Sequence, residues 1–140
     1  MDIGCNDPKK INNTLLLEEH GWTGVAFDIV DFSNEWKERK AKFIQANVIE
    51  YDFGKIRKKI DYLSLDVDSI GTNCFVMKRL IDYGFVFKAI TIEHNIYAGN
   101  EYDICERIPQ RELLSQNGYV LVKPDVSDDV NKFEDWWTHV

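Results

Sequence analysis

The sequence predicts an α/β fold of the Rossmann-like type, built on a mostly parallel sheet. Three hydrophobic runs end in an acid, at Asp28, Asp66 and Glu93, which is typical of buried parallel strands that lead to a ligand crevice. Strand-like and helix-like segments alternate along the chain, as they do in βαβ units. The last two strand-like segments lie too close together for a crossover helix, so we expect an antiparallel C-terminal strand.

The expected strands are rich in β-branched and aromatic residues and are bounded by turn residues. They cover residues 1–5, 22–29, 42–49, 61–67, 85–93, 119–123 and 133–140. The first expected helix begins at Asp7-Pro8 and runs to about His20, because Asp is a good N-cap, Pro suits the first helical position and Gly21 suits the end. Further helices are expected over residues 33–40, 73–83 and 109–117.

Length and charge limit the possible classes of protein. The 140 residues predict a single domain over 1–140, and the aromatic content of 13% argues against disorder. The net charge of −7 argues against nonspecific binding to nucleic acid, which requires clustered Lys and Arg. The basic run Lys55-Ile56-Arg57-Lys58-Lys59 is a local exception, which we interpret as a solvated face.

The cysteines and the hydropathy pattern bear on the cellular compartment in which the protein is expected. The three cysteines Cys5, Cys74 and Cys105 are an odd number without C-x-x-C spacing, which favours reduced thiols and a cytoplasmic location. No apolar run has the length of a membrane span, so no membrane partner is expected. The first residues lack the pattern of a signal peptide. They enter a strand at once, so we expect either that the first strand is short or that upstream residues are missing from this sequence.

The turn after the first strand is a candidate ligand site. Gly4 permits a positive φ and a close approach to the backbone, and Asn6 tolerates the left-handed region better than most residues. A helix after Pro8 would present free N–H groups to a polar ligand. The alternative is an ordinary tight turn, with Cys5 as a small filler.

Asp28 ends the second strand about 20 residues after this turn. Nucleotide-binding sheets place an acid on the ribose diol at this position, although an acid here can also be a helix cap. G-x-G-x-x-G is absent, and no phosphate-binding Lys or Arg lies nearby. The pattern therefore favours a nucleoside ligand without phosphate.

Polar residues also follow the fourth and fifth strands. Asp66 and Asp68 are separated by one residue, so they share a face of an extended chain. They are candidates for a general base, a substrate clamp or metal ligands, and the alternative is a pair of capping acids before the next helix. Glu93, His94 and Asn95 end the fifth strand. His94 can accept a proton near neutral pH, and its alternative is a structural histidine.

Four segments, taken in order, resemble the FkbM-type S-adenosylmethionine-dependent methyltransferases. They are Asp2-Ile3-Gly4-Cys5-Asn6-Asp7, Gly21-Trp22-Thr23-Gly24, Asp61-Tyr62-Leu63-Ser64-Leu65-Asp66-Val67-Asp68 and Ile92-Glu93-His94-Asn95. The resemblance covers nearly the whole chain. It implies the class I methyltransferase sandwich, a seven-stranded sheet with one antiparallel strand, and O-methylation of a small-molecule or sugar hydroxyl.

The resemblance also implies roles for single residues. The turn over residues 2–6 would hold the methionine part of the cofactor, Asp28 the ribose, Asn47-Val48 the base, and Asp66 would lie beside the sulfonium. The full expected cofactor set is Asp2, Gly4, Cys5, Asn6, Asp28, Ile29, Asn47, Val48 and Asp66. Asp66 is the expected central catalytic residue, with His94 or Asp68 as base, while Glu93 and Asn95 would bind the acceptor; no metal is expected.

Departures from the family pattern leave an alternative open. Pro8 stands where the family commonly has Gly, Ile29 where Glu-Pro is common, and Ser69-Ile70-Gly71 where Glu, Gly and His are usual. The alternative is a degenerate, non-catalytic domain of the same fold that binds a nucleoside or a protein partner. A receiver-like domain ranks last because no Lys follows Glu93 closely. Exposed aromatic edges of a short sheet would favour a homo-oligomer.

Overall fold

The computed structural model describes residues 1–140 and contains one seven-stranded sheet in the order β3-β2-β1-β4-β5-β7-β6. Neighbouring strands are parallel except that β7 runs antiparallel to both β5 and β6. This confirms the expected mostly parallel sheet with an antiparallel C-terminal strand. The strands are β1 (Asp2–Ile3), β2 (Val25–Asp28), β3 (Lys42–Gln45), β4 (Lys59–Leu65), β5 (Val86–Glu93), β6 (Tyr119–Ser127) and β7 (Lys132–His139).

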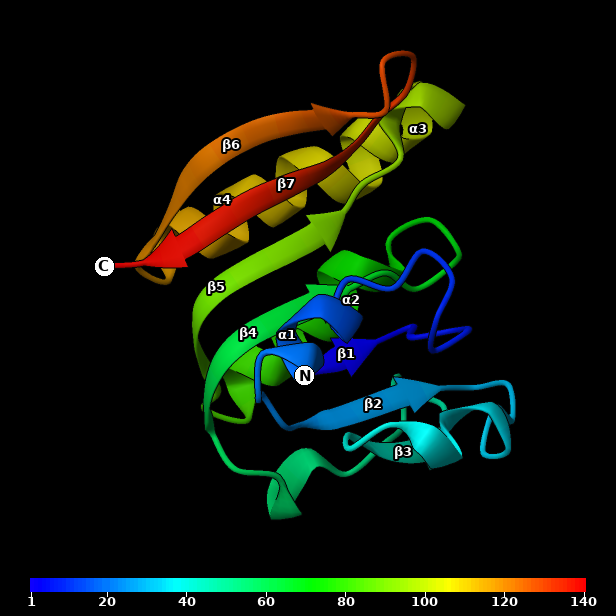
Figure 1. Ribbon diagram of the computed structural model, residues 1–140. Helices are drawn as coiled ribbons and strands as arrows, with labels where there is room; N and C mark the ends of the chain where they lie inside the picture. Colours follow the sequence, from blue (N-terminus) through cyan, green and yellow to red (C-terminus); the bar gives the residue numbers. More distant parts are fainter.

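The helices cover the two faces of the sheet unequally. They are α1 (Leu15–Glu19), α2 (Thr72–Asp82), α3 (Asn100–Tyr102) and α4 (Ile108–Gln116). In Figure 1, α2 and α4 lie behind the sheet, and the short α1 alone lies in front of β1 and β4. No helix lies in front of β5, β7 and β6 in this view, so the covering on both faces that a sandwich implies is incomplete.

The first expected helix is mostly absent, and this expectation was wrong. The Asp7 carboxylate accepts the backbone N–H groups of Lys9 and Lys10, which closes a local turn instead of starting a helix. The side chains of Asn12 and Thr14 are bonded to Asp2. Side chains that bond in this way compete with helical hydrogen bonding, so the helix is limited to the five residues of α1.

Two further helices differ from expectation. Residues 33–40 form only the 3-10 helix Glu35–Glu38, whose Trp36 is buried. The helix expected over 109–117 belongs to a longer helical run that includes the π-helix Asp103–Arg107. Pro109 lacks an N–H and its ring crowds the preceding turn, and a wider π turn just before it accommodates this. The remaining short elements are the 3-10 helices Phe53–Lys55 and Ile96–Ala98.

The main core lies between the sheet and the helices behind it. Leu63 and Leu65 of β4, Ile90 of β5 and Trp137 of β7 are at most 2% exposed and pack in one cluster with α2. Because these residues fix the strands up to their carboxyl ends, the polar residues that follow have defined positions. No helix combines the length and apolar composition that crossing a membrane requires.

Candidate functional site

The turn after β1 is held against the end of β4. Gly4 has φ +77°, and a Cβ built on it would lie 1.6 Å from the carbonyl oxygen of Asp66. The Asp66 N–H donates to the carbonyl of Ile3 at 2.9 Å. Only glycine allows this approach, because any side chain would overlap the Asp66 backbone. Gly4 therefore allows the close approach between the carboxyl ends of β1 and β4.

Asp28 connects the same turn to the end of β2. Asn6 adopts the expected left-handed conformation, with φ +46°, and its N–H donates to Oδ2 of Asp28 at 2.9 Å. The second oxygen, Oδ1, accepts the N–H of Val30 at 2.9 Å. Trp36 fixes the turn from outside, since its indole N–H donates to the Asn6 carbonyl at 2.8 Å. The half-buried Asp28 carboxylate is thus oriented by two backbone N–H groups.

Three other residues of the expected cofactor set have different surroundings. The side chain of Ile29 is exposed, whereas Cys5 is buried beside Ala26 in a small second core, and burial raises the pKa of its thiol. Asp2 is also buried, and its Oδ2 accepts the Thr14 hydroxyl at 2.7 Å. Burial raises the pKa of Asp2 above its usual value. Asp2 lies among the residues at the start of the strands, away from Asp28.

Asn47 and Val48 follow β3 in a tight turn. The Asn47 side-chain oxygen accepts the N–H of Ile49 at 3.1 Å, and the Asn47 carbonyl accepts the N–H groups of Glu50 and Tyr51. Val48 is 6% exposed and belongs to the main core. Of the two, only Asn47 therefore has a partly exposed side chain next to the carboxyl ends of β2 and β3.

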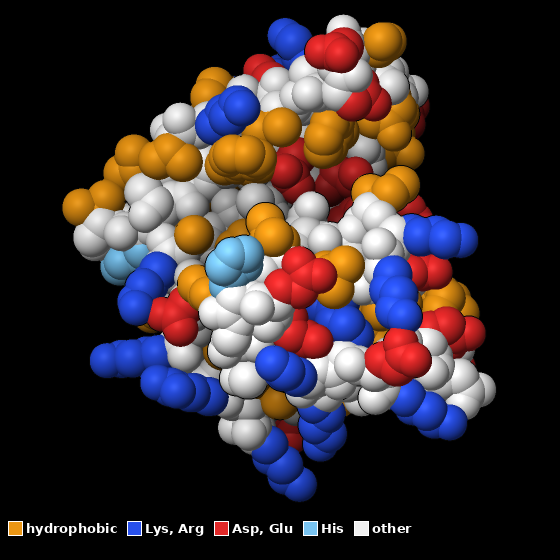
Figure 2. All heavy atoms as spheres, in the orientation of Figure 1, with side chains coloured by type: hydrophobic (Ala, Val, Ile, Leu, Met, Phe, Trp, Pro, Cys, Tyr) orange, Lys and Arg blue, Asp and Glu red, His pale blue; other side chains and the backbone are white.

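Three acids gather where β4 and β5 end and β7 begins. Asp66 follows β4, Glu93 ends β5, and Glu134 of β7 is paired in register with Glu93. Figure 2 shows acidic side chains recessed in a hollow near this part of the sheet. Burial and the neighbouring Asp66 carboxylate raise the pKa of Glu93 to about 9. Burial also raises the pKa of Glu134. The Glu93 carboxyl therefore carries a proton at neutral pH.

Asp68, His94 and Asn95 lie around a separate small cavity of about 40 Å³. The buried amide of Asn73 positions its walls: Oδ1 accepts the N–H of Val67 at 2.7 Å, and Nδ2 donates to the Glu93 carbonyl at 3.2 Å. The structure thus divides the expected catalytic residues, because Asp66 does not line this cavity. The lining residues are Val67, Asp68, Ser69, Asn73, His94, Asn95, Tyr102 and Glu106.

His94 also contacts a network of charged side chains. Its ring is fully buried, and Nε2 lies 3.5 Å from Oδ1 of Asp135 and 3.6 Å from Oδ1 of Asp125. Arg111 donates to both oxygens of Asp135, at 2.7 and 2.9 Å. Arg107 donates to Asp125 at 2.9 Å. Burial alone would raise the pKa of Asp135, but Arg111, His94 and the Asp125 N–H hold that pKa well below its usual range.

His94, Asp125 and Asp135 each offer a metal-ligand atom within 4.8 Å of the others. The two carboxylates, however, already accept hydrogen bonds from two guanidinium groups, those of Arg107 and Arg111. A divalent cation among these ligands would be repelled by the two guanidinium charges. It would also have to compete with them for the carboxylate oxygens that it requires as ligands. The donor set therefore does not suit a metal ion.

Sequence reasoning missed the acids of β7 and their partners. Asp135 is two residues before the buried Trp137, and side chains two apart on a strand share a face. That spacing places the Asp135 side chain on the core-facing side of β7, where a buried carboxylate requires a positively charged partner. The spacing was visible in the sequence, but the partners of Asp135 were not, because Arg111 is 24 residues away on α4.

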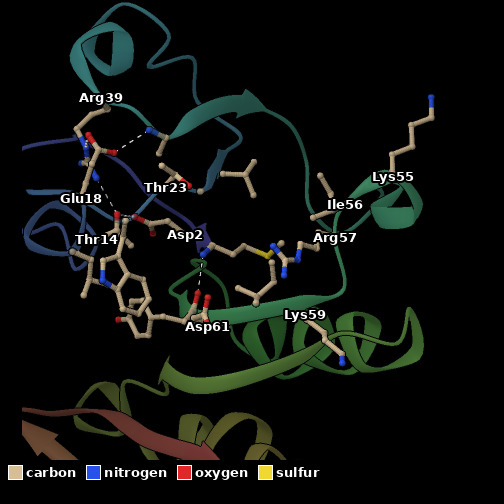
Figure 3. Close-up of a pocket in the computed structure, with 18 residues that line it drawn as sticks. Asp2, Thr14, Glu18, Thr23, Arg39, Lys55, Ile56, Arg57, Lys59 and Asp61 are labelled. Carbon is tan, nitrogen blue, oxygen red and sulfur yellow. Dashed lines mark hydrogen bonds and ion pairs between the residues drawn. The ribbon is translucent and has the colours of Figure 1, made fainter. Parts of the chain in front are cut away.

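A second cavity, larger than the one beside His94, lies at the opposite end of the sheet, where β1, β2 and β4 begin. Its volume is about 390 Å³. In Figure 3, Arg39, Glu18 and Asp2 lie together on one side of it, whereas Lys55 and Lys59 extend away from it. Two of the charged groups within it form an ion pair, in which Arg39 Nε lies 3.1 Å from Glu18 Oε1. Ligands of open α/β sheets bind beyond the carboxyl ends of the strands, so we do not assign the cofactor to this cavity.

No protein-family model matches this chain, and no curated protein matches it. The assignment of function therefore rests on the geometry at the carboxyl ends of the strands and on the resemblance described above.

Proposed function

We propose that this protein is an S-adenosylmethionine-dependent methyltransferase of the FkbM type that methylates a hydroxyl of a small molecule or sugar. The observation that carries the proposal is the contact between three strand ends. Gly4 packs on the Asp66 backbone, and Asn6 donates to Asp28. Together they form a turn with an acid at the carboxyl ends of three adjacent strands, where open α/β sheets bind nucleosides.

The residues present suit the nucleoside part of this cofactor. Each oxygen of Asp28 accepts one backbone N–H, which leaves further lone pairs for the two ribose hydroxyls. Asn47, next to the end of β3, would meet the base, and the Gly4–Asn6 turn would approach the methionine part. When bound, the cofactor would supply an electrophilic methyl group on a positively charged sulfur.

The acids at the ends of β4 and β5 would act on the other side of the site. The Asp66 carboxylate would favour a positive charge beside it. Glu93, which is hydrogen-bonded to the Asn95 amide at 2.7 Å, would bind a hydroxyl of the acceptor. Asp68 and His94 are the candidates for the group that removes the hydroxyl proton.

The direct test is calorimetric titration of the protein with S-adenosylmethionine and S-adenosylhomocysteine. We expect micromolar binding that weakens at least about tenfold in Asp28→Ala, since one charged hydrogen bond contributes about 1.5–3 kcal/mol. Asp31→Ala is the matched control, because Asp31 is an exposed acid three residues away that bonds only Ser33.

Each variant is first compared with the parent by circular dichroism and thermal unfolding, because Asp28 also orients the turn. Absence of binding by the folded parent protein would contradict the proposal. Equal weakening in Asp31→Ala would show that the effect of Asp28→Ala is only one of net charge.

One observation favours a second candidate, a non-catalytic domain of the same fold that binds a nucleoside or a protein partner. The segment after Gly4 forms turns instead of a helix, so the turn lacks the helix N-terminus that commonly faces a ligand in such sheets. Cofactor binding without methyl transfer to any of a panel of sugar and phenol acceptors would favour this candidate. Transfer to any acceptor would exclude it.

A further inference from the structure

The side-chain amide of Asn73 joins the ends of β4 and β5. Asn73 is 3% exposed and lies in the first turn of α2, a helix behind the sheet in Figure 1. Its Oδ1 accepts the N–H of Val67, the residue after Asp66, at 2.7 Å. Its Nδ2 donates to the backbone carbonyl of Glu93 at 3.2 Å. One buried amide therefore fixes the backbone next to the two acids.

The position of the Asn73 amide is itself fixed. Its two partners are an N–H and a carbonyl, so only one orientation of the amide satisfies both. The backbone N–H of Asn73 donates to Glu106 at 3.3 Å. Gln110 donates to Glu106 at 2.7 Å and to the Glu93 carbonyl at 2.9 Å. Because these groups are buried, moving Asn73 would leave polar atoms without partners, which is costly.

The two acids that this amide holds in place would repel each other if both were ionised. The side chain of Glu93 donates a hydrogen bond to that of Asp66. Glu134 from β7 and Tyr97 from the 3-10 helix Ile96–Ala98 also face Glu93, and neither is a cation. The next residue, His94, faces the charged network of β6 and β7 instead. Two carboxyl groups in such a site retain one proton between them.

We infer that Asn73 is a positioning residue that holds Asp66 and Glu93 together as one acid pair with a shared proton. The role of this pair in methyl transfer rests on the proposed function. The pair would present an O–H donor and a carboxylate acceptor to the methyl acceptor, whose hydroxyl both donates and accepts.

The test is a pH titration of the Glu93 carboxyl carbon in the ¹³C-labelled full chain, followed by NMR without cofactor. We expect a pKa of about 9 for Glu93 in the unmodified protein, and the Glu93→Gln spectrum assigns the signal. In Asn73→Ala the two strand ends separate and water enters between the carboxyl groups. The pKa of Glu93 should then fall by at least about one unit. A pKa of Glu93 in the ordinary range in the unmodified protein overturns the inference.

Asn117→Ala is the matched control, because Asn117 is an exposed amide whose side chain donates only within its own helix, to the Leu113 carbonyl. It should leave the pKa of Glu93 unchanged. If Asn73→Ala does not fold, Asn73→Ser replaces it, since a serine hydroxyl is too short to bridge both partners. A purely structural role of Asn73 would lower the urea midpoint alone. A folded variant that retains the parent pKa of Glu93 therefore excludes the positioning role.

A double-mutant cycle tests whether Asn73 acts through Asp66. Asp66→Asn removes the charge that favours the proton on Glu93, so it should also lower the pKa of Glu93. In the Asp66→Asn background, Asn73→Ala should then cause a much smaller shift than in the parent protein. Equal shifts in both backgrounds would mean that Asn73 affects Glu93 through burial alone, and would overturn the inference.

The titrations need no cofactor, so their failure is distinguishable from failure of the methyltransferase proposal. Where methyl transfer is found, the pH profile of kcat should fall at high pH as Glu93 loses its proton. In Asn73→Ala this fall should move to lower pH by the same amount as the pKa of Glu93. A profile that stays in place while that pKa changes would show that the acid pair does not act on the methyl acceptor.

Discussion

At the end of the sheet where β1, β2 and β4 begin, two buried charges form an ion pair, whereas at the end where β4 and β5 finish, three acids lie together without one. Glu18 and Arg39 form a buried ion pair at the first end. At the second end, Asp66, Glu93 and Glu134 are close together, and none of them has an ion-pair partner among the salt bridges of the structure.

The contrast distinguishes buried charges that stabilise the fold from buried charges that destabilise it. A paired buried ion becomes costly when its partner is removed, so Glu18 and Arg39 serve the structure. Buried acids whose pKa is raised, as those of Glu93 and Glu134 are, reduce stability at neutral pH, and such groups often gather at binding and catalytic sites. Four predictions test this division, from the largest expected effect to the smallest.

Gly4→Ala should be the most damaging single substitution in the chain. Its Cβ would overlap the Asp66 carbonyl, and φ is +77°. We expect a loss of about 4 kcal/mol or more in the free energy of unfolding, measured by urea denaturation. Gly21→Ala is the matched control: Gly21 has φ +90° with no atom within 4 Å, so about 1–2 kcal/mol is expected. Equal losses would show that the contact with β4 is unimportant.

Glu18→Ala should destabilise the protein by about 3 kcal/mol, because it leaves the buried Arg39 without its counter-charge. It also frees the N–H groups of Lys40 and Ala41, which Glu18 accepts at 2.8 and 2.9 Å. Glu19→Ala, the substitution of its exposed neighbour, should change stability by less than about 0.5 kcal/mol. Similar urea midpoints for the two variants would show that the buried Glu18–Arg39 ion pair does not stabilise the fold.

Glu93 should make stability fall as the pH rises. Its pKa increases from 4.5 to about 9 on folding, so the folded protein binds this proton more tightly than the unfolded chain does. The contribution is fully present below pH 4.5 and is lost as the pH rises through 9. Because the site is partly solvated, we expect a loss of only about 1–2 kcal/mol.

Thermal unfolding from pH 5 to pH 9 measures this effect, with Glu93→Gln as the test variant. Glu93→Gln should be the more stable protein at pH 8 and should show a flatter pH dependence. Glu101→Gln, at an exposed position of α3, serves as the control for net charge. A pH dependence of the same slope in Glu93→Gln and the parent would contradict the assignment.

The smallest expected effect concerns the turn after β1. Asn6 has φ +46°, so Asn6→Ala should cost about 1 kcal/mol and Asn6→Gly almost nothing, since glycine adopts this conformation freely. Guanidinium denaturation of both variants compares them directly. A larger loss in Asn6→Gly than in Asn6→Ala would mean that the Asn6 side chain, which accepts the N–H of Asp7, outweighs the backbone conformation.

Local patterns in the sequence were sufficient for much of the fold. The β-branched runs before Asp28, Asp66 and Glu93 predicted β2, β4 and β5, because strands buried on both faces must be continuously apolar. The short spacing before residues 133–140 predicted the antiparallel β7. The helix after Pro8 could not be excluded from sequence, since Asp2 and Arg39, which bond the side chains of this segment, approach it only in the folded chain.

The candidate site was predictable as a set of residues but not as an arrangement. The sequence determined which side chains follow the strands, because strand ends and the acids after them are local features. Only the tertiary structure decided that Glu93 lies beside Asp66 whereas His94 faces Asp135, because Asp66 and Asp135 belong to other segments that only the folded sheet brings next to β5. Partners such as Arg111 come from distant segments, and only the packing of α4 against the sheet brings them together.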